Sequence, residues 1–578
     1  MARKVGIGIQ DYGKIIENNC FYVDKTSFVK EWWESRDEVT LITRPRRFGK
    51  TLTMSMVEQF FSVKYTGRSD LFEGMSIWND EYYRDLQGTY PVICLSFAVV
   101  KEKNFRTASY RIRQLLMQLY EQNRFLQESP RLSGAEKEYY DRMASDMSEE
   151  DAPMALHKLS EFLYRHYGKK VIILLDEYDT PMQEAYVSGY WEEIVGFTRS
   201  MFNAAFKTNP WLERALMTGI TRVSKESIFS DLNNLEVVTT TTDKYASSFG
   251  FTEEEVFCAM DEYEYGEKDQ VKFWYDGFVF GSVSDIYNPW SILNYLDKRK
   301  FTTYWANTSS NSLVGKLIRE GSRNIKQSFE TLMQGECLRT VIDEQIVYDQ
   351  LEQNESAIWG LLLASGYLKA VGFKTYEGKC SYDDIKEPEY ELELTNLEVR
   401  LMFRNMVKGW FGVSQADYND FIKALLLGNI KAMNTYMNRV ALATFSYFDT
   451  GKKPSEETEP ERFYHGFVLG LIVDLSDRYY ITSNRESGFG RYDVMLEPRN
   501  NNFDISNHDV RLNQCDAIIM EFKVRDAESE GTLQDTVQSA LKQIDEMRYS
   551  ASLIEKGFPP ERIKKYGFAF EGKKVMIG

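Results

Sequence analysis

The chain has 578 residues, of which 43% are hydrophobic and 27% are charged, a balance typical of a soluble globular protein. This length predicts two to four domains with ample core. The formal net charge of −17 argues against a protein that coats nucleic acid over its whole surface, but not against a confined basic channel. No apolar run approaches the roughly 20 residues that span a bilayer, so we expect no membrane segment.

The cysteines are scattered along the chain and form no CxxC pair. Their spacing argues against a zinc site or a disulfide framework. A reducing compartment, the cytoplasm, fits this pattern best. The six positions are Cys20, Cys94, Cys258, Cys337, Cys380 and Cys515.

Strands and helices alternate in the first 250 residues. Segment Val39–Thr43 is short, apolar and β-branched, which predicts a buried strand. Strands alternating with helices predict a mainly parallel α/β sheet. Further strands are predicted at Tyr90–Phe97, Val171–Leu175 and Ala215–Thr218, with helices at Leu52–Phe61, Phe105–Phe125 and Ala155–Tyr167.

The pattern becomes mostly helical after residue 250. Thr252 and Glu255 have the spacing of a capping box, which predicts a helix at Val256–Tyr263. Strands are predicted near Leu368 and at Tyr390–Leu394. The polar, proline-containing segment 451–460 is the best linker candidate.

The C-terminal segment predicts a separate α/β domain with its own core. The expected elements are a helix at Arg462–Leu475, strands at Gly490–Leu496, Ala517–Val524 and Tyr566–Phe570, and a helix at Thr536–Tyr549. The expected domains are therefore residues 1–250, a helical lid and middle region at 251–450, the linker at 451–460, and residues 461–578.

Gly49, Lys50 and Thr51 stand between a predicted strand and a predicted helix, which is the geometry of a phosphate-binding loop. The start of a helix presents free N–H groups and a positive dipole end to phosphate. In such a loop the Lys50 ammonium reaches the β/γ-phosphates and the Thr51 hydroxyl holds Mg²⁺.

The standard GxxxxGK[ST] pattern has a glycine where this chain has Arg44. On its own, the Gly49-Lys50-Thr51 motif therefore does not distinguish a nucleotide site from a coincidental match. If the loop binds nucleotide, Arg47 and Phe48 also belong to it.

Asp176 and Glu177 follow the predicted strand Val171–Leu175. Ligands of open α/β sheets bind at the carboxyl ends of the strands. We expect Asp176 to act on Mg²⁺ and Glu177 to polarise the attacking water. The alternative is a pair of solvated carboxylates after a core strand, which the upstream Lys50 makes less attractive.

Three further residues stand near the ends of these strands. Thr218 could sense the γ-phosphate at the end of its strand. Arg222 is a candidate to stabilise transition-state charge, in its own subunit or in a neighbour's, with a surface arginine as the alternative. Asp179 is expected to be a helix cap.

The chain resembles the AAA-ATPase-like family of bacterial proteins that carry a C-terminal PD-(D/E)XK nuclease-superfamily domain. The resemblance implies a P-loop NTPase sheet with a helical lid, a mostly helical middle region and a nuclease-like α/β domain. It also implies that an arginine-rich loop is normal here, so Arg44 does not count against the site. The segments that carry the resemblance are Tyr22–Thr26, Arg44–Thr51, Leu175–Asp179, Thr218–Arg222, Leu232–Leu235 and Trp274–Gly277.

Asp493, Glu521 and Lys523 form a second candidate centre. On a strand, Glu521 and Lys523 project to the same face because they are two residues apart. A carboxylate pair can hold Mg²⁺, which activates water and neutralises phosphate charge. A salt-bridged strand face is the alternative. The resemblance adds Gln543 and Tyr549, on and after the following helix.

The sequence thus predicts an intracellular bacterial ATPase, with ATP and Mg²⁺ as cofactors, coupled to a metal-dependent nuclease. Nucleic acid is the expected partner, with DNA or RNA undecided, and no membrane is expected. The oligomeric state is open, with a homo-oligomer as one alternative. The competing hypothesis is an ATP-dependent switch or scaffold whose nuclease fold is inactive and only binds nucleic acid or protein.

Overall fold

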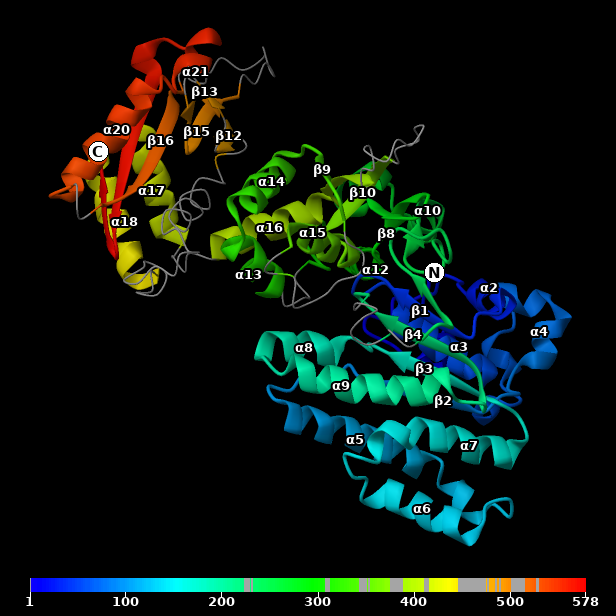
Figure 1. Ribbon diagram of the computed structural model, residues 1–578. Helices are drawn as coiled ribbons and strands as arrows, with labels where there is room; N and C mark the ends of the chain where they lie inside the picture. Colours follow the sequence, from blue (N-terminus) through cyan, green and yellow to red (C-terminus); the bar gives the residue numbers. More distant parts are fainter. Residues whose placement is uncertain are drawn as a thin grey trace, which may run out of the picture. The chain divides into compact units, whose positions relative to one another are not determined.

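The computed structural model divides into two compact units (Figure 1). Unit 1 comprises Met1–Ser309 and Arg339–Val399, and unit 2 comprises Ser310–Leu338 and Arg400–Gly578. The predicted linker and nearly all of the helix predicted after it lie outside the described residues, and the predicted domain boundaries stay a prediction. The structure describes residues 2–222, 229, 232–306, 312–342, 351, 354–374, 388–409, 415–444, 475, 478–483, 486–487, 490–499, 515–526 and 530–578.

A five-stranded parallel sheet forms the centre of unit 1, as predicted. Its order is β2-β3-β4-β1-β5. The register pairs Ile42 with Thr218 and Ser96 with Asp176, so the carboxyl ends of the strands reach one edge. The strands are β1 (Val39–Thr43), β2 (Val92–Ser96), β3 (Val171–Asp176), β4 (Leu212–Gly219) and β5 (Leu235–Val238).

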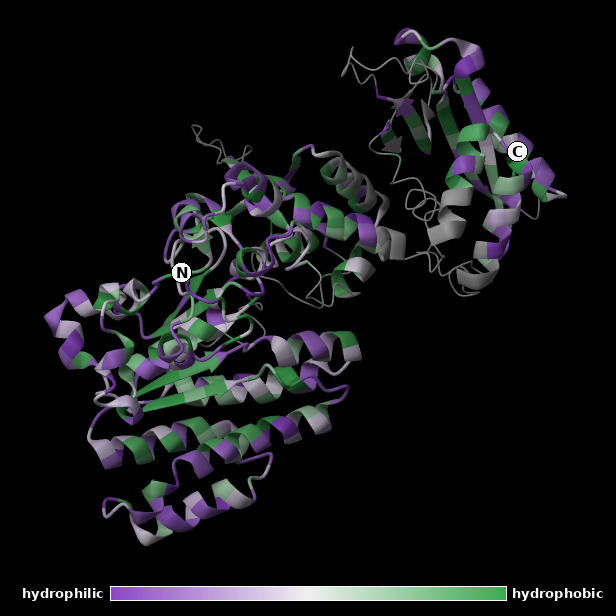
Figure 2. Ribbon diagram, turned by 180° about the vertical axis from the view of Figure 1, so that it is seen from behind, coloured by the Kyte–Doolittle hydropathy of each residue, from purple (hydrophilic) through white to green (hydrophobic). Residues whose placement is uncertain are grey.

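Helices cover both faces of this sheet, which explains its continuous apolar strands. Ile172 and Leu174 of β3 join the core that includes α3, while Ile173 between them is also fully buried. Figure 2 shows the central strands as hydrophobic and the surrounding helices as mixed. The helices are α1 (Tyr12–Glu17), α2 (Ser27–Ser35), α3 (Lys50–Phe61), α4 (Glu81–Leu86), α5 (Phe105–Gln122), α6 (Gly134–Ser145), α7 (Ala155–Tyr167), α8 (Thr180–Ser188) and α9 (Trp191–Phe202).

The rest of unit 1 combines short strands with helices. The predicted capping box of Thr252 and Glu255 is present at the start of α10. Gly277 is required by close packing, because a Cβ there would lie 2.0 Å from the Thr395 carbonyl oxygen. The elements are β6 (Phe251–Thr252), α10 (Glu253–Glu262), α11 (Lys268–Tyr275), β7 (Phe278–Phe280), β8 (Val283–Tyr287), α12 (Pro289–Lys298), β9 (Leu338–Thr340), α15 (Glu355–Ala364), β10 (Leu368–Lys374) and β11 (Glu389–Leu394).

Unit 2 contains a five-stranded mixed sheet of order β12-β15-β16-β17-β18, in which only β16 and β17 are parallel. The predicted strand Ala517–Val524 is β16, and the predicted C-terminal helix is α20. The strands of this sheet are β12 (Tyr479–Ser483), β15 (Val494–Pro498), β16, β17 (Ile563–Glu571) and β18 (Lys574–Ile577). The short strands β13 (Glu486–Ser487) and β14 (Gly490–Arg491) pair with each other. The helices are α13 (Ser312–Glu320), α14 (Arg323–Gln334), α17 (Gln415–Leu427), α18 (Ile430–Thr444), α20 (Leu533–Glu546) and α21 (Ala551–Glu555).

Helix α18 lies along the edge strand of this sheet. The Asn434 side chain donates to the Ile577 carbonyl at 2.7 Å and accepts from the Ile577 N–H at 2.9 Å. Asn438, one turn later, makes the same pair of bonds with Val575, at 2.6 and 3.1 Å. The helical pair α17–α18 is therefore part of the same unit as the C-terminal sheet.

In the described part of the chain, the helices lack the combination of length and apolar character that crossing a bilayer requires.

Candidate functional sites

The loop between β1 and α3 closes around the Lys50 side chain. The Lys50 Nζ donates to the carbonyl oxygens of Arg44 and Pro45, both at 2.8 Å. Burial lowers the pKa of this ammonium to about 8. Arg47 and Gly49 have positive φ angles of 67° and 84°, which bend the loop. The ammonium is thus held inside the loop by the carbonyls of Arg44 and Pro45.

Arg44 anchors the start of the loop. Its guanidinium is buried and donates to the carbonyls of Thr43 at 3.0 Å and Thr239 at 2.6 Å. It also lies over the Phe280 ring, at 4.5 Å from the centroid. Burial lowers the pKa of this side chain. The residue that replaces the expected glycine is therefore a structural anchor.

Three predicted site residues converge at the carboxyl edge of the parallel sheet. The Thr51 hydroxyl donates to the Asp176 Oδ2 atom at 2.8 Å, and the Thr218 hydroxyl donates to its Oδ1 atom. Asp176 is buried. The start of α3 and the ends of β3 and β4 thus meet at one carboxylate.

Glu177 follows Asp176 in the chain and has a left-handed backbone conformation, with φ of 51°. Its Oε2 atom accepts from the Thr180 hydroxyl at 3.2 Å. Few non-glycine residues adopt this conformation, and those that do often lie at functional sites. The strand-end position of Glu177 is as predicted, and its role stays a prediction.

Asp179 is not the expected helix cap. It precedes α8, but its side chain makes no capping bond there. Its Oδ2 atom instead accepts from the N–H groups of Ile220 and Thr221, at 3.0 and 2.9 Å, and from the Thr221 hydroxyl at 2.9 Å. A carboxylate with these partners fixes the turn after β4, which leads directly to Arg222.

Residues between 278 and 305, for which the sequence predicted no role, hold the phosphate loop from outside. The Arg46 carbonyl accepts from the Trp305 Nε1 atom at 2.9 Å and from the Asn288 side chain at 3.3 Å. The Arg47 guanidinium lies over the Trp290 ring at 4.3 Å. The buried Phe48 ring packs edge-on against two phenylalanines of β7. The aromatic run around Trp290 was the available signal.

Asp493, directly before β15, lies beside Glu521 of β16 in unit 2. The antiparallel register pairs Val494 with Met520, so Asp493 comes opposite Glu521. The Phe522 N–H donates to the Asp493 Oδ2 atom at 2.7 Å, and the Asp493 N–H donates to the Glu521 Oε2 atom at 3.4 Å. Both carboxylates are buried. This donor set of adjacent carboxylate oxygens fits a hard cation such as Mg²⁺.

Gln543 of α20 reaches the same site. Its Nε2 atom donates to the Glu521 Oε1 atom and to the Tyr549 hydroxyl, the latter at 3.1 Å. Gly567 pairs with Glu521 across β16 and β17, and a Cβ there would lie 2.8 Å from the Val537 carbonyl of α20. The glycine therefore allows α20 to approach the sheet where Gln543 meets Glu521. The signal for Gly567 was a glycine inside a strand.

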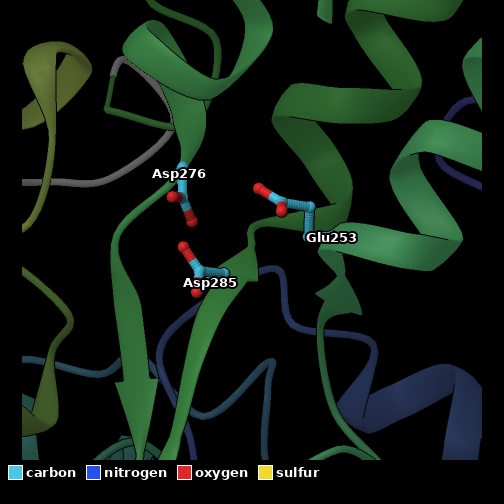
Figure 3. Close-up of side chains that lie close together, drawn as sticks. All are labelled: Glu253, Asp276 and Asp285. Atoms are coloured by element: carbon cyan, nitrogen blue, oxygen red, sulfur yellow. The ribbon is translucent and has the colours of Figure 1, made fainter. Parts of the chain in front are cut away.

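A third acidic group is held by a lysine of this chain. Glu253, Asp276 and Asp285 lie together, with Asp276 and Asp285 turned toward each other (Figure 3). The Lys272 ammonium pairs with all three, at 3.0 Å from Asp285 and 3.8 Å from Asp276. Burial and the neighbouring Asp285 raise the pKa of Asp276 to about 7. We assign this group as a structural ion-pair network because the ammonium supplies its cation.

Comparison with known proteins matches both ends of the chain. Residues 6–229 match the AAA-ATPase-like family, described as a predicted AAA-ATPase, and residues 459–578 match the PD-(D/E)XK nuclease superfamily. A curated relative from Azotobacter chroococcum mcd 1 is 26% identical over 401 residues, which cover 69% of this chain and 68% of the relative. It is described as "Uncharacterized protein in vnfD 5'region".

The matched segments contain both sites. Residues 6–229 include the phosphate loop and Asp176, and residues 459–578 include Asp493 and Glu521. One chain therefore carries an N-terminal segment that matches the AAA-ATPase-like family and a C-terminal segment that matches the PD-(D/E)XK nuclease superfamily.

Proposed function

We propose that this protein binds and hydrolyses ATP and couples that reaction to a Mg²⁺-dependent nuclease acting on DNA or RNA. The observation that carries the ATPase proposal is the convergence of Thr51 and Thr218 on the buried Asp176 carboxylate. Both families are families of phosphate chemistry, and the two carboxylate sites lie within the matched segments.

In the proposed ATPase site, the positions of the side chains suit distinct roles in binding and catalysis. Lys50 exchanges its two loop carbonyls for phosphate oxygens, and the first N–H groups of α3 bind phosphate. Thr51 and Asp176 supply the oxygen atoms that hold Mg²⁺, which neutralises phosphate charge when bound. Glu177 orients the attacking water, and Arg222 stabilises the charge that develops.

In the nuclease-like site, Asp493 and Glu521 hold Mg²⁺, which lowers the pKa of bound water. Lys523, two residues after Glu521 on β16, faces the same side and stabilises negative charge on the phosphate. Gln543 orients the Glu521 carboxylate through its amide.

One observation favours the alternative of an inactive, binding-only nuclease fold. The Gln543 amide already donates to the Glu521 Oε1 atom, so a metal at that oxygen would compete with this hydrogen bond. A scaffold switched by ATP would use the same unit to bind nucleic acid or protein without cleavage.

The ATPase proposal is tested by phosphate release with Mg²⁺ and ATP. Lys50→Ala should abolish nucleotide binding or turnover because the loop loses its ammonium. Lys14→Ala removes an exposed lysine of α1 and is the matched control. Unchanged hydrolysis in Lys50→Ala would refute the assignment.

The nuclease proposal is tested on single- and double-stranded DNA and RNA, with Mg²⁺, with and without ATP. Glu521→Ala should abolish cleavage, whereas Glu546→Ala, at an exposed position of α20, should leave it intact. Chelation of Mg²⁺ should also stop the reaction. The absence of cleavage by the wild-type protein under every nucleotide condition would support the binding-only alternative.

A further inference from the structure

The peptide between Arg46 and Arg47 is fixed by two side chains from outside the phosphate loop. Its carbonyl accepts from the Trp305 indole at 2.9 Å and from the Asn288 amide at 3.3 Å. In a trans peptide the C=O and the following N–H point in opposite directions. The direction of the Arg46 carbonyl therefore determines the direction of the Arg47 N–H. Such loop N–H groups are the donors that bind phosphate.

Trp305 is itself fixed by a buried carboxylate. The Glu398 Oε1 atom accepts from the N–H groups of Trp305 at 2.6 Å and Ala306 at 3.4 Å, and also from that of Tyr304. Its Oε2 atom accepts from the Ser291 hydroxyl at 2.8 Å. Burial raises the pKa of Glu398, and these donors oppose that rise.

Glu398 is connected to the second donor as well. Ser291 lies in the first turn of α12, and Asn288 caps that helix through bonds to the N–H groups of Trp290 and Ser291. The same Asn288 side chain donates to the Arg46 carbonyl. Both donors to the loop peptide are thus held in the network around Glu398.

Glu398 lies in the first turn of helix α16 (Leu397–Gly409). This helix starts in unit 1, which ends at Val399, and continues in unit 2 from Arg400. Backbone hydrogen bonds join each turn of an α-helix to the next, so a displacement of the first turn of α16 acts on the turn that follows it. The last link of the network is therefore covalently continuous with unit 2.

We propose that Trp305 is a positioning residue for nucleotide binding, and that Glu398 transmits the state of the phosphate loop to unit 2 through α16. This inference rests on the proposed ATP-binding function. Phosphate bound to the Arg47 N–H reorients the Arg46–Arg47 peptide and so changes the hydrogen bonds that the Arg46 carbonyl accepts from Trp305 and Asn288. Trp305 is bonded to Glu398 directly, and Asn288 is connected to it through Ser291. The device couples the two units without requiring a nucleotide contact in unit 2.

Trp305→Phe in the full-length chain removes the indole donor and keeps an aromatic ring. We expect the Kd and KM for Mg-ATP to rise roughly 3- to 10-fold, the effect of one hydrogen bond, with kcat little changed. Hydrogen–deuterium exchange of residues 397–409 should respond to a non-hydrolysable ATP analogue in the wild type. At saturating analogue this response should be absent in Trp305→Phe.

Glu398→Gln should abolish the exchange response of α16 with a smaller effect on Kd. If that variant fails to fold, Ser291→Ala removes one bond of the same network and should weaken the response. Trp274→Phe is the matched control, because its ring stacks on Phe301 in the same part of unit 1. It should retain wild-type affinity and the wild-type exchange response.

Two results separate failure of this inference from failure of the ATPase proposal. Wild-type affinity and a preserved α16 response in Trp305→Phe, with binding lost in Lys50→Ala, would overturn the inference alone. If the wild-type protein binds no ATP, the ATPase proposal and the inference fail together.

Discussion

At the scale of single residues, the buried charge of Arg44 stands where the standard phosphate-loop motif has a glycine. The Arg44 guanidinium donates to the carbonyls of Thr43, Thr239, Lys244 and Tyr245 and lies over the Phe280 ring, and these contacts offset part of the cost of its burial. A glycine at this position would allow the chain to bend, but it has no side chain that could bond the loop to neighbouring segments. The anchoring of this loop therefore depends on the arginine that departs from the motif.

Arg44→Gly, which restores the standard pattern, should destabilise the protein. The carbonyl of Thr239 would lose a buried donor and the arginine site would become a cavity, at a cost of about 2–4 kcal/mol. Urea unfolding of unit 1 measures the change. Arg44→Lys keeps the charge without the planar fork and should give an intermediate value. Equal unfolding of Arg44→Gly and wild type would contradict the anchoring role.

The raised pKa of Asp276 predicts that the free energy of unfolding depends on pH. Its pKa is raised from 3.8 to about 7, so the folded state holds a proton that the unfolded state releases. Its stabilising contribution is complete below pH about 4 and is lost as the pH rises through about 7. The facing groups are Asp285, Glu253, Lys272 and the Tyr287 hydroxyl.

Asp276→Asn cannot titrate and should flatten the change in free energy of unfolding between pH 4 and pH 7. Chemical unfolding at several pH values measures this slope. Asp261→Asn, an exposed aspartate of α10, should keep the wild-type slope. A wild-type slope in Asp276→Asn would show that the proton is held elsewhere.

At the scale of elements, α18 protects a sheet edge with side-chain amides. An amide carries one acceptor and two donors, so it can imitate the N–H and C=O of a neighbouring strand. Asn434 and Asn438 are one helical turn apart and meet Ile577 and Val575, two residues apart on β18. An unprotected edge strand is a template for aggregation.

Replacing both asparagines of α18 by leucine should destabilise unit 2. Backbone groups of β18 would lose their partners, at about 1–3 kcal/mol for each group left unsatisfied. Thermal unfolding should shift to lower temperature, and light scattering should show earlier aggregation. Thr435→Ala, at an exposed position between them, is the control. Unchanged unfolding and scattering in the double variant would show that α18 does not protect the edge.

At the scale of the whole molecule, one chain carries two carboxylate sites in separate compact units, joined in part by α16. With a net charge of −17, favourable contact with nucleic acid has to be confined to part of the surface. Helix α16, which begins at the network around Glu398 and continues past Val399, is the element through which we propose that the phosphate loop is coupled to unit 2.

Nuclease activity in the wild-type protein should therefore depend on ATP. Cleavage rates with and without ATP measure the dependence, and Lys50→Ala should show one rate under both conditions. Lys14→Ala should respond as the wild type does. Equal rates with and without ATP in the wild type would contradict the coupling while leaving each activity intact.

The sequence by itself determined the parts whose signal is local. Apolar β-branched runs marked β1 and β3, since a strand buried on both faces needs apolar residues throughout. The spacing of Thr252 and Glu255 marked a helix start. Both carboxylate sites were predicted from residue types and strand positions, and the family resemblance supported them. The convergence of Thr51 and Thr218 on Asp176 followed because parallel strands end at one sheet edge.

Only the tertiary structure decided how the loop is held and what Asp179 does. The bonds from Asn288 and Trp305 to Arg46 span 242 and 259 residues, and that from Trp305 to Glu398 spans 93. No local pattern encodes such pairs, because a hydrogen bond depends on distance in space and not on separation in sequence. Asp179 likewise stands at the cap position of α8, but its carboxylate accepts hydrogen bonds from Ile220 and Thr221 after β4 instead.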